Sequence, residues 1–560
     1  MIRKVRATGY NSQVSLRDDV AHIVIGGVSD DPEVLKAYSR DTSIFERMPE
    51  LVAFPKDADD VAALVKYVRK AKEMGRHISL TGRAAGTDMS GGPLTDSIVV
   101  SFTKHMNRVL EVGYDTCVAE PGVYYRDLEK ATLKQTGRLI PPYPASRELC
   151  ALGGMLANNC AGELTLLYGK MNRYVLELDV VLSDGSRATF HPLSKEELKT
   201  KKKEQTLEGD IYRRTHKLIE ENEEEIENAR PSVSKNSAGY ALWDVLDKEN
   251  ETFDLTQLIV GSQGTLALIT RARVALEKLE ENRSMLVVFL SDLAVLPEVV
   301  RRVRAFYPES FESYDNHTFK LAVRFAGDFL RQLGLRDAVR LGFAFLPEVW
   351  MAITGGIPKL VLLAEFASAT DMTARDKARE ARLAIADLPI ASRLAFGMME
   401  EKYWKIRRES FALLRKHIHG LHAAPFIEDI VVNPDDYPRF LPELNTLLSQ
   451  YDIMYTIAGH IGNGNFHIIP LMDMKRPEHR KIILELAPKV YELVARYNGS
   501  ITGEHNDGIM RTTYLHYMFS PRTLDLFAEV KNIFDPLNIF NPGKKVGGTV
   551  EDIERYMIHT

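Results

Sequence analysis

A segment that contains two histidines, residues 458–467, constrains the fold of this chain more than any other. Asn463-Gly464 inside it is the preferred dipeptide of a two-residue hairpin turn, because both residues accept a positive φ. A turn at these two residues pairs His460 with His467 across the hairpin. Directly opposed side chains lie about 4.5–5.5 Å apart, so we expect two imidazoles on one face, able to share a divalent cation. The alternative is two surface histidines that flank a turn.

A second cluster, residues 503–508, places a carboxylate and an imidazole side by side as Glu504 and His505. Two histidines and one carboxylate, with coordination positions left open, are the pattern of a catalytic rather than a structural metal site. The two segments together therefore predict a metal centre that takes part in chemistry.

Composition limits the class of protein. The 560 residues exceed what one core organises, so two or three domains are expected. The net charge of −5 gives no argument for nucleic acid binding. No run approaches the ~18 apolar residues of a membrane span, and the basic segment Met1–Arg6 lacks the apolar stretch of a signal peptide. The three cysteines include no C-x-x-C pair, which argues against disulfides and iron–sulfur clusters and favours a cytoplasmic protein.

Three segments rich in small residues recur along the first half of the chain, at 81–92, 153–162 and 260–270. Small residues let backbone N–H groups approach an anionic ligand closely. The first is neither a G-x-G-x-x-G motif nor a P-loop, and its glycines taken alone are more typical of an ordinary tight loop. Around them we predict a helix that begins at Asp57 and ends at Gly75, and a strand within Val20–Ile25.

The pattern changes near Lys278, after a charge-rich helical segment at 194–230 that we interpret as a solvated insertion. Beyond that point, apolar strands alternate with amphipathic helices, a pattern typical of a separate α+β sheet with helices on one side. The expected strands include Met285–Leu290 and Leu360–Phe366, and the expected helices include Val295–Phe306 and Asp376–Ile385.

These motifs, in this order and closed by Asn541-Pro542-Gly543, resemble the FAD-linked D-2-hydroxyacid dehydrogenases of the vanillyl-alcohol oxidase superfamily. That family includes D-lactate dehydrogenase, the glycolate oxidase flavin subunit and D-2-hydroxyglutarate dehydrogenase. The resemblance covers roughly residues 40–545. It implies an α+β fold: a two-part FAD-binding domain plus an α+β cap with an antiparallel sheet. The predicted boundaries are 1–40 for a lead-in, 41–277 for the FAD-binding domain, 278–500 for the cap, and 501–560 for a segment that returns to the FAD-binding domain.

The resemblance assigns non-covalent FAD to the small-residue segments, because the 83–92 loop lacks the histidine to which some relatives attach flavin. Gly264, Thr265 and Ile269 would lie near the adenosine half. The full set of implied cofactor-binding residues is Arg83, Ala84, Ala85, Gly86, Thr87, Asp88, Ser90, Gly91, Pro142, Gly153, Gly154, Asn158, Asn159, Ala161, Gly162, Tyr168, Gly264, Thr265, Ile269, Asn465 and Asn541.

The resemblance also implies roles at the metal centre. His460, His467 and Glu504 correspond to the metal ligands, for zinc or manganese, and His505 corresponds to the catalytic base. Arg407 resembles the arginine that grips the substrate carboxylate; the other reading is a surface arginine on a charged helix. Two residues depart from the family: Asn506 stands where relatives have glycine, and Gln263 where they have glutamate.

The implied activity is oxidation of a D-2-hydroxy acid to the 2-oxo acid, by metal-assisted proton abstraction and hydride transfer to flavin. D-lactate is the first expectation, with glycolate and D-2-hydroxyglutarate as alternatives. Two other readings stay open: a flavoenzyme without net redox that resembles alkyl-glycerone-phosphate synthase, and a flavin subunit of a larger electron-transfer complex. The expected partners are the small acid and an electron-accepting protein or quinone, not nucleic acid. A homodimer and a peripheral contact with the inner membrane are left open.

Overall fold

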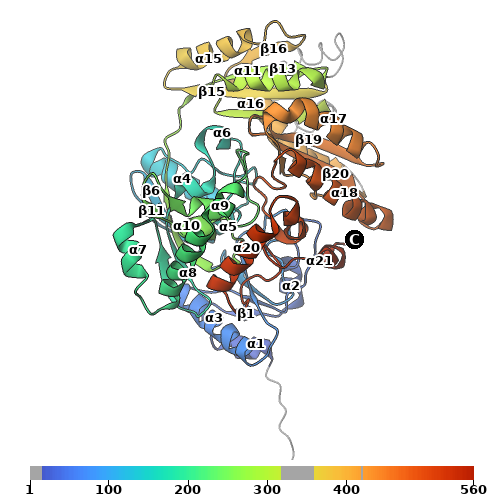
Figure 1. Ribbon diagram of the computed structural model, residues 1–560. Coiled ribbons are helices and arrows are strands. Elements are labelled where there is room, and N and C mark those ends of the chain that lie inside the picture. Colours follow the sequence, from blue (N-terminus) through green and yellow to red (C-terminus); the bar gives the residue numbers. More distant parts are fainter. Residues whose placement is uncertain (1–14, 317–357, 418–419, 560) are drawn as a thin grey trace, which may run out of the picture.

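The computed structural model describes residues 15–316, 358–417 and 420–559, so the basic Met1–Arg6 segment lies outside the described residues. Three main sheets organise the chain (Figure 1). The first two belong to the part drawn below in Figure 1, and the third forms the part above it. We call residues 282–499 the cap and the remaining described residues the base. None of the described helices is long and apolar enough to cross a membrane.

The first sheet of the base carries the first small-residue segment on its end strand. Its three adjacent strands β2, β4 and β3 run parallel, and β1 joins the edge antiparallel. The bounds in sheet order are β1 Val28–Ser29, β2 Leu51–Ala53, β4 Ile98–Ser101 and β3 Leu80–Arg83. Helix α3 (Ala58–Glu73) covers it and confirms the predicted helix, with the Asp57 carboxylate accepting two backbone N–H groups of its first turn. Near the C-terminus, Phe540 bridges to Leu80 in parallel, so the last segment returns to the base.

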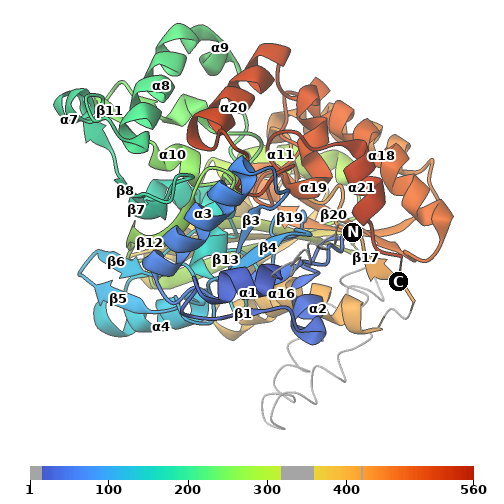
Figure 2. The same ribbon diagram turned by 90° about the horizontal axis from the view of Figure 1, so that it is seen from below.

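The second sheet of the base is antiparallel throughout. Its strands in order are β5 Val109–Val112, β6 Thr116–Ala119, β12 Leu268–Ala275, β7 Val175–Val181 and β8 Arg187–Phe190. The predicted helical insertion forms α7 (Lys195–Lys201), α8 (Leu207–Glu221) and α9 (Glu223–Asn228). It is only partly solvated, because Ile211, Tyr212 and Leu218 are buried and α8 packs against α20 (Pro521–Phe534), as Figure 2 shows.

In the part of the cap that the structure describes, eight strands form one antiparallel sheet. The long strands at its centre are β13 Asn282–Leu290, β15 Leu360–Ser368, β14 Ser310–Asp315, β19 Met454–His460 and β20 Asn465–Met472; β16 Ala391–Ala395, β17 His422–Ala423 and β18 Ile430–Val431 complete it. The fold class predicted from the sequence, a two-part base with an α+β antiparallel cap, is confirmed.

Helices cover both faces of the cap sheet, whereas the sequence pattern predicted one. On β13, Leu286 and Val288 share a hydrophobic cluster with α11 (Leu296–Arg304) and α15 (Asp371–Leu383). Met285 and Val287 point to the other face and pack against Tyr403 and Trp404 of α16 (Met398–His417). Helix α16 thus lies between the cap sheet and the base (Figure 1). Two of its side chains, Arg407 and Arg408, line a cavity.

The predicted strand within Val20–Ile25 is wrong. Residues Leu16–Ala21 form helix α1, whose first turn is capped by the Ser15 hydroxyl accepting from the N–H of Asp18. Leu16, Val20 and Val24 are all buried. Leu16 and Val20 are four residues apart and lie on one face of α1, and a short apolar run does not reveal that period.

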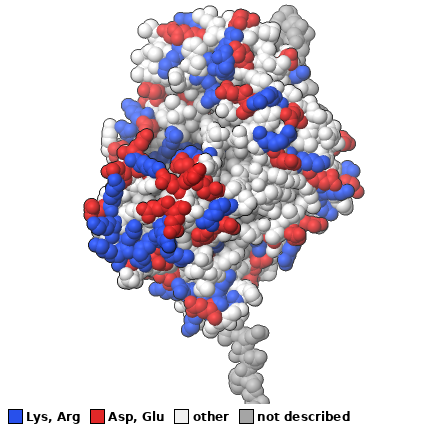
Figure 3. All heavy atoms as spheres, in the orientation of Figure 1, with Lys and Arg blue, Asp and Glu red and all other residues white. Residues whose placement is uncertain are grey.

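Charged side chains of both signs are interspersed over the face of the molecule shown in Figure 3, most densely on its left side. The acidic and basic residues that matter for the candidate site are instead buried between base and cap.

Candidate metal and cofactor site

The histidine hairpin forms, but its register differs from the predicted one. Ala458, not His460, lies opposite His467, and His460 lies opposite Asn465. The expected two-residue turn is replaced by a 3₁₀ turn over Ile461–Asn463, closed by Gly464 at φ 78°. Tertiary contacts select this longer turn: the Tyr437 hydroxyl donates to the Ile461 carbonyl at 2.9 Å.

The two imidazoles meet in spite of the changed register. His467 is two residues beyond Asn465, so it stands on the same face of the sheet, diagonally across from His460. The ring centroids are 5.2 Å apart. The predicted juxtaposition therefore exists for a different geometrical reason.

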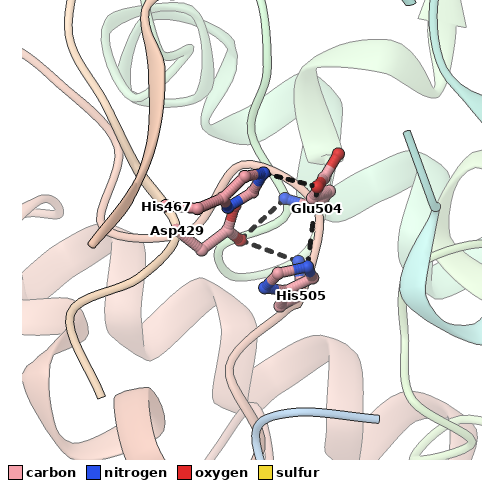
Figure 4. Close-up of side chains that lie close together, drawn as sticks. All are labelled: Asp429, His467, Glu504 and His505. Carbon is pink, nitrogen blue, oxygen red and sulfur yellow. Dashed lines mark hydrogen bonds and ion pairs between the residues drawn. The ribbon is translucent and has the colours of Figure 1, made fainter. Parts of the chain in front are cut away.

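The segment with Glu504 and His505 is brought to the hairpin by Asp429, a residue that the sequence reasoning missed. The Asp429 carboxylate is fully buried and accepts from the backbone N–H groups of Glu504 and His505 at 2.8 and 2.7 Å. It also accepts from the Thr502 hydroxyl and the Asn465 amide. These four hydrogen bonds show that Asp429 fixes the loop, and Figure 4 shows the two that come from Glu504 and His505.

The three imidazoles converge on one oxygen atom. The Nε2 atoms of His460, His467 and His505 lie 3.4, 3.3 and 3.5 Å from Glu504 Oε1. Each Nδ1 atom faces another acceptor: Glu312 Oε1 at 2.6 Å for His460, the Glu428 carbonyl at 2.8 Å for His467, and Glu428 Oε1 at 3.0 Å for His505. An Nδ1–H that is held in this way leaves the Nε2 lone pair of a neutral imidazole directed at the site.

This donor set fits a divalent cation. Nitrogen and oxygen ligands bind zinc at about 2.0–2.2 Å, and two such donors at a tetrahedral angle are roughly 3.4 Å apart. The separations of 3.3–3.5 Å match that value. The predicted ligands His460, His467 and Glu504 are thus brought together, with His505 at equal distance. Asp429, His467, Glu504 and His505 also group within 4.8 Å of one another, but the four hydrogen bonds of Asp429 favour the predicted set.

The electrostatics of the cluster depend on burial and on neighbouring carboxylates. Burial alone would raise the pKa of Glu504, but Lys235 and the histidines hold it well below its usual range. Burial lowers the pKa of His467. For His505, burial also lowers the pKa, yet Asp429 and Glu428 outweigh it and raise the pKa to about 9 in the metal-free site.

Arg407 reaches the same cavity from α16. Its Nη2 atom lies 3.1 Å from Glu312 Oε2, and Glu312 in turn holds His460. The Arg407 side chain is 15% exposed and lines the cavity with Glu504 and His505. The surface-arginine reading therefore does not describe its position.

One cavity of about 880 Å³ joins the metal cluster to the small-residue loops of the base. Twelve of the residues predicted to bind the cofactor line it: Arg83, Ala84, Ala85, Gly86, Thr87, Asp88, Gly153, Gly154, Asn158, Ala161, Gly264 and Ile269. Ala84 and the glycines present little side chain, which leaves backbone accessible to a large anionic ligand. The sequence reasoning did not find the part of the wall at residues 143–151.

The other predicted cofactor residues do not line the cavity and hold its walls instead. Asn541 donates to the carbonyls of Gly92 and Gln263, and Asn465 donates to Asp429. Tyr168 reaches from base to cap, where its hydroxyl donates to Glu309 at 3.1 Å. The remaining members of this group are Ser90, Gly91, Pro142, Asn159, Gly162 and Thr265.

Two family models cover most of the chain: the FAD binding domain matches residues 49–190, and the C-terminal domain of FAD linked oxidases matches 279–545. The chain belongs to the FAD-linked oxidases. Among curated relatives, D-2-hydroxyglutarate dehydrogenase of Escherichia coli is 29% identical over 90% of this chain and 49% of its own length. Glycolate oxidase subunit GlcD of Bacillus subtilis is 26% identical over 90% and 91% of the two chains, and D-lactate dehydrogenase of Archaeoglobus fulgidus 26% over 89% and 91%.

The chain spans about half the length of the D-2-hydroxyglutarate dehydrogenases that it matches first. Among solved structures, 4-ethylphenol oxidase from Gulosibacter chungangensis has a TM-score of 0.65 at 16% identity, over 94% of this chain and 95% of that one. An alkyldihydroxyacetonephosphate synthase has a TM-score of 0.62 at 16% identity, over 92% and 83%. These two likenesses show the fold of the FAD-linked oxidase.

The two departures from the family pattern have structural explanations in this FAD-linked oxidase. Asn506 adopts φ 68°, a left-handed conformation that asparagine tolerates better than most residues. Its side-chain amide donates to the Gly261 carbonyl at 2.9 Å, so it ties the loop of His505 to the cofactor loop. Gln263 accepts from the N–H of Gly508 and donates to Ser90, and the second of these roles is closed to a glutamate carboxylate.

Proposed function

We propose that this FAD-linked oxidase oxidises a D-2-hydroxy acid to the 2-oxo acid, with D-lactate as the first candidate substrate and glycolate and D-2-hydroxyglutarate as alternatives. The observation that carries the proposal is the convergence of three imidazole Nε2 atoms on Glu504 Oε1, at the end of a cavity lined by the small-residue loops. The names of the relatives support the substrate class.

His460, His467 and Glu504 would hold the divalent cation, zinc or manganese, and the loops at 83–88 and 153–161 would hold FAD without a covalent bond. When bound, the cation would lower the pKa of the substrate hydroxyl, and FAD would supply the hydride acceptor. The protein's own side chains remove the hydroxyl proton and bind the substrate.

His505 takes the hydroxyl proton at Nε2. Its Nδ1 atom is held by Glu428 at 3.0 Å, and Glu428 is itself held by the fully buried Arg511. This chain of contacts fixes the ring plane and the tautomer, which a base must have before the substrate arrives.

Arg407 binds the substrate carboxylate. A planar guanidinium can present two parallel N–H groups to a carboxylate, and Arg407 already faces one in Glu312. With its carboxylate at Arg407 and its hydroxyl near His505, the substrate has a fixed orientation at C2. This reduces the entropy that is lost in reaching the transition state.

A panel of D- and L-2-hydroxy acids, assayed with an artificial dye acceptor, tests this proposal. We expect turnover with one or more D-acids and little with their L-enantiomers. Activity confined to L-acids would contradict the proposal. A flavin that no member of the panel reduces would favour one of the two alternatives: a reaction without net redox, like that of alkyl-glycerone-phosphate synthase, or a flavin subunit of a larger complex.

A further inference from the structure

Lys235 reaches the metal cluster from the segment that follows α9. It is not one of the proposed metal ligands, and the proposed reaction gives it no role. Its side chain is fully buried. Its Nζ atom lies 3.2 Å from Glu504 Oε2 and 3.4 Å from Asn465 Oδ1. The histidines approach the other oxygen of the same carboxylate, Oε1.

Three buried glutamates at the site each pair with a lysine or arginine, whereas Asp429 accepts from amide, hydroxyl and backbone N–H groups. Glu312 pairs with Arg407 at 3.1 Å and Glu428 with Arg511 at 2.6 Å. Glu504 pairs with Lys235 at 3.2 Å. A cluster built only to attract a dication would leave its carboxylate ligand without a cation, whereas here the anionic ligand is already compensated.

We propose that Lys235 is an internal counter-cation of the metal site: it holds Glu504 Oε2, leaves Oε1 facing the histidines, and lowers the affinity of the site for a divalent cation. Lys235 is thus a positioning residue, and the inference rests on the metal site of the proposed function. If Lys235 has this role, it influences both the stability of the protein without metal and the rate at which the metal exchanges.

The sign of the effect follows from charge. An ammonium next to the carboxylate ligand repels a dication bound a few ångströms away, and burial weakens the screening of that repulsion. Without a dication, the same ammonium offsets the buried charge of Glu504, and removal of one partner of a buried pair is strongly destabilising. Lys235 therefore favours the metal-free state and disfavours the loaded one.

The test compares Lys235→Met and Lys235→Gln with the wild type, as full-length, FAD-loaded protein. Methionine keeps most of the length of the side chain without charge, and glutamine keeps a hydrogen-bond donor without charge. Zn²⁺ dissociation constants come from competition with a chelator, and unfolding temperatures are measured with and without Zn²⁺. We expect both variants to bind Zn²⁺ roughly tenfold or more tighter, and to unfold at a lower temperature only when metal-free.

Lys531→Met is the matched control. It removes another buried lysine from a carboxylate, Asp535 at 2.6 Å, in a helix that does not line the cavity. It should lower the unfolding temperature with and without Zn²⁺ and leave the dissociation constant unchanged.

Zn²⁺ affinity that is unchanged or weaker in Lys235→Gln would overturn the inference, even if Lys235→Met does not fold. A wild-type protein that binds no Zn²⁺ would instead refute the metal site itself. The two failures are therefore distinguishable.

Discussion

At the scale of single residues, His505 is the position where two roles predict different results. If His505 is the base, His505→Ala should slow flavin reduction by roughly 10²–10⁴-fold. Zinc and FAD content should stay near normal because His460, His467 and Glu504 remain. The distance of 3.5 Å between His505 Nε2 and Glu504 Oε1 also permits His505 to be a principal metal ligand. In that case the same substitution should remove the metal. Stopped-flow reduction with metal analysis separates the two roles, and full-speed reduction by the variant would remove His505 from the reaction.

The pH dependence of flavin reduction should also show whether His505 is the base. A base acts in its neutral form, so the limiting reduction rate should rise with pH through the pKa of His505. That pKa is about 9 in the metal-free site. A bound dication disfavours the imidazolium and lowers the pKa, so the midpoint for the loaded protein should lie below 9. The rising limb should be absent in His505→Ala, and a limb that persists there would assign the proton transfer to another group.

Arg407 provides a test of carboxylate recognition. Arg407→Lys keeps the charge but loses the two parallel donors, so the Kd of an active 2-hydroxy acid should rise on the order of tenfold, ~1.4 kcal/mol. The measurement is a titration of the flavin spectrum with substrate under anaerobic conditions. Lys405→Arg on the same helix is the control, because it does not line the cavity. Unchanged affinity in Arg407→Lys would exclude the residue from the substrate site.

At the scale of elements, the hairpin turn depends on Gly464. It adopts φ 78°, and a Cβ there would lie 1.9 Å from the backbone oxygen of Val432. Gly464→Ala should therefore cost the left-handed penalty of about 1–2 kcal/mol together with the cost of moving the backbone of a buried segment. Gly137→Ala, at φ 69° with nothing within 4 Å, should show the conformational penalty alone. Chemical denaturation compares them, and equal losses would contradict the close approach.

The elements also show how far sequence reasoning reaches. The Asn-Gly signal predicted the hairpin and the meeting of His460 with His467, because period-two alternation survives a change of turn. It did not predict the register, since Tyr437, far away in the chain, selects the longer turn. Lys235, Glu312, Glu428 and Asp429 left no local pattern in the sequence. Their roles arise only when β14, the segment before β18 and the 230s loop converge on the hairpin.

At the scale of the whole molecule, the base and the cap together enclose the cavity, so neither part contains a complete site. The base supplies the small-residue loops, and the segment near residue 504 returns from the cap to the base. The resemblance predicted this architecture and a substrate class together, but no local motif of the sequence identifies one substrate within that class.

The cofactor should be held without a covalent bond, because the 83–92 loop contains no histidine. The purified protein should be yellow, and denaturation followed by filtration should release all FAD into the filtrate. Flavin that stays with the unfolded chain would contradict this assignment.

The central claim, that a divalent cation at His460, His467 and Glu504 is needed for oxidation of a D-2-hydroxy acid, is tested most directly by anaerobic stopped-flow reduction of the bound flavin before and after chelation. We predict that a D-acid active in the panel reduces the flavin of the loaded protein, that chelation abolishes reduction while FAD stays bound, and that Zn²⁺ or Mn²⁺ restores it. Reduction at an undiminished rate by protein shown to contain no divalent metal would contradict the account.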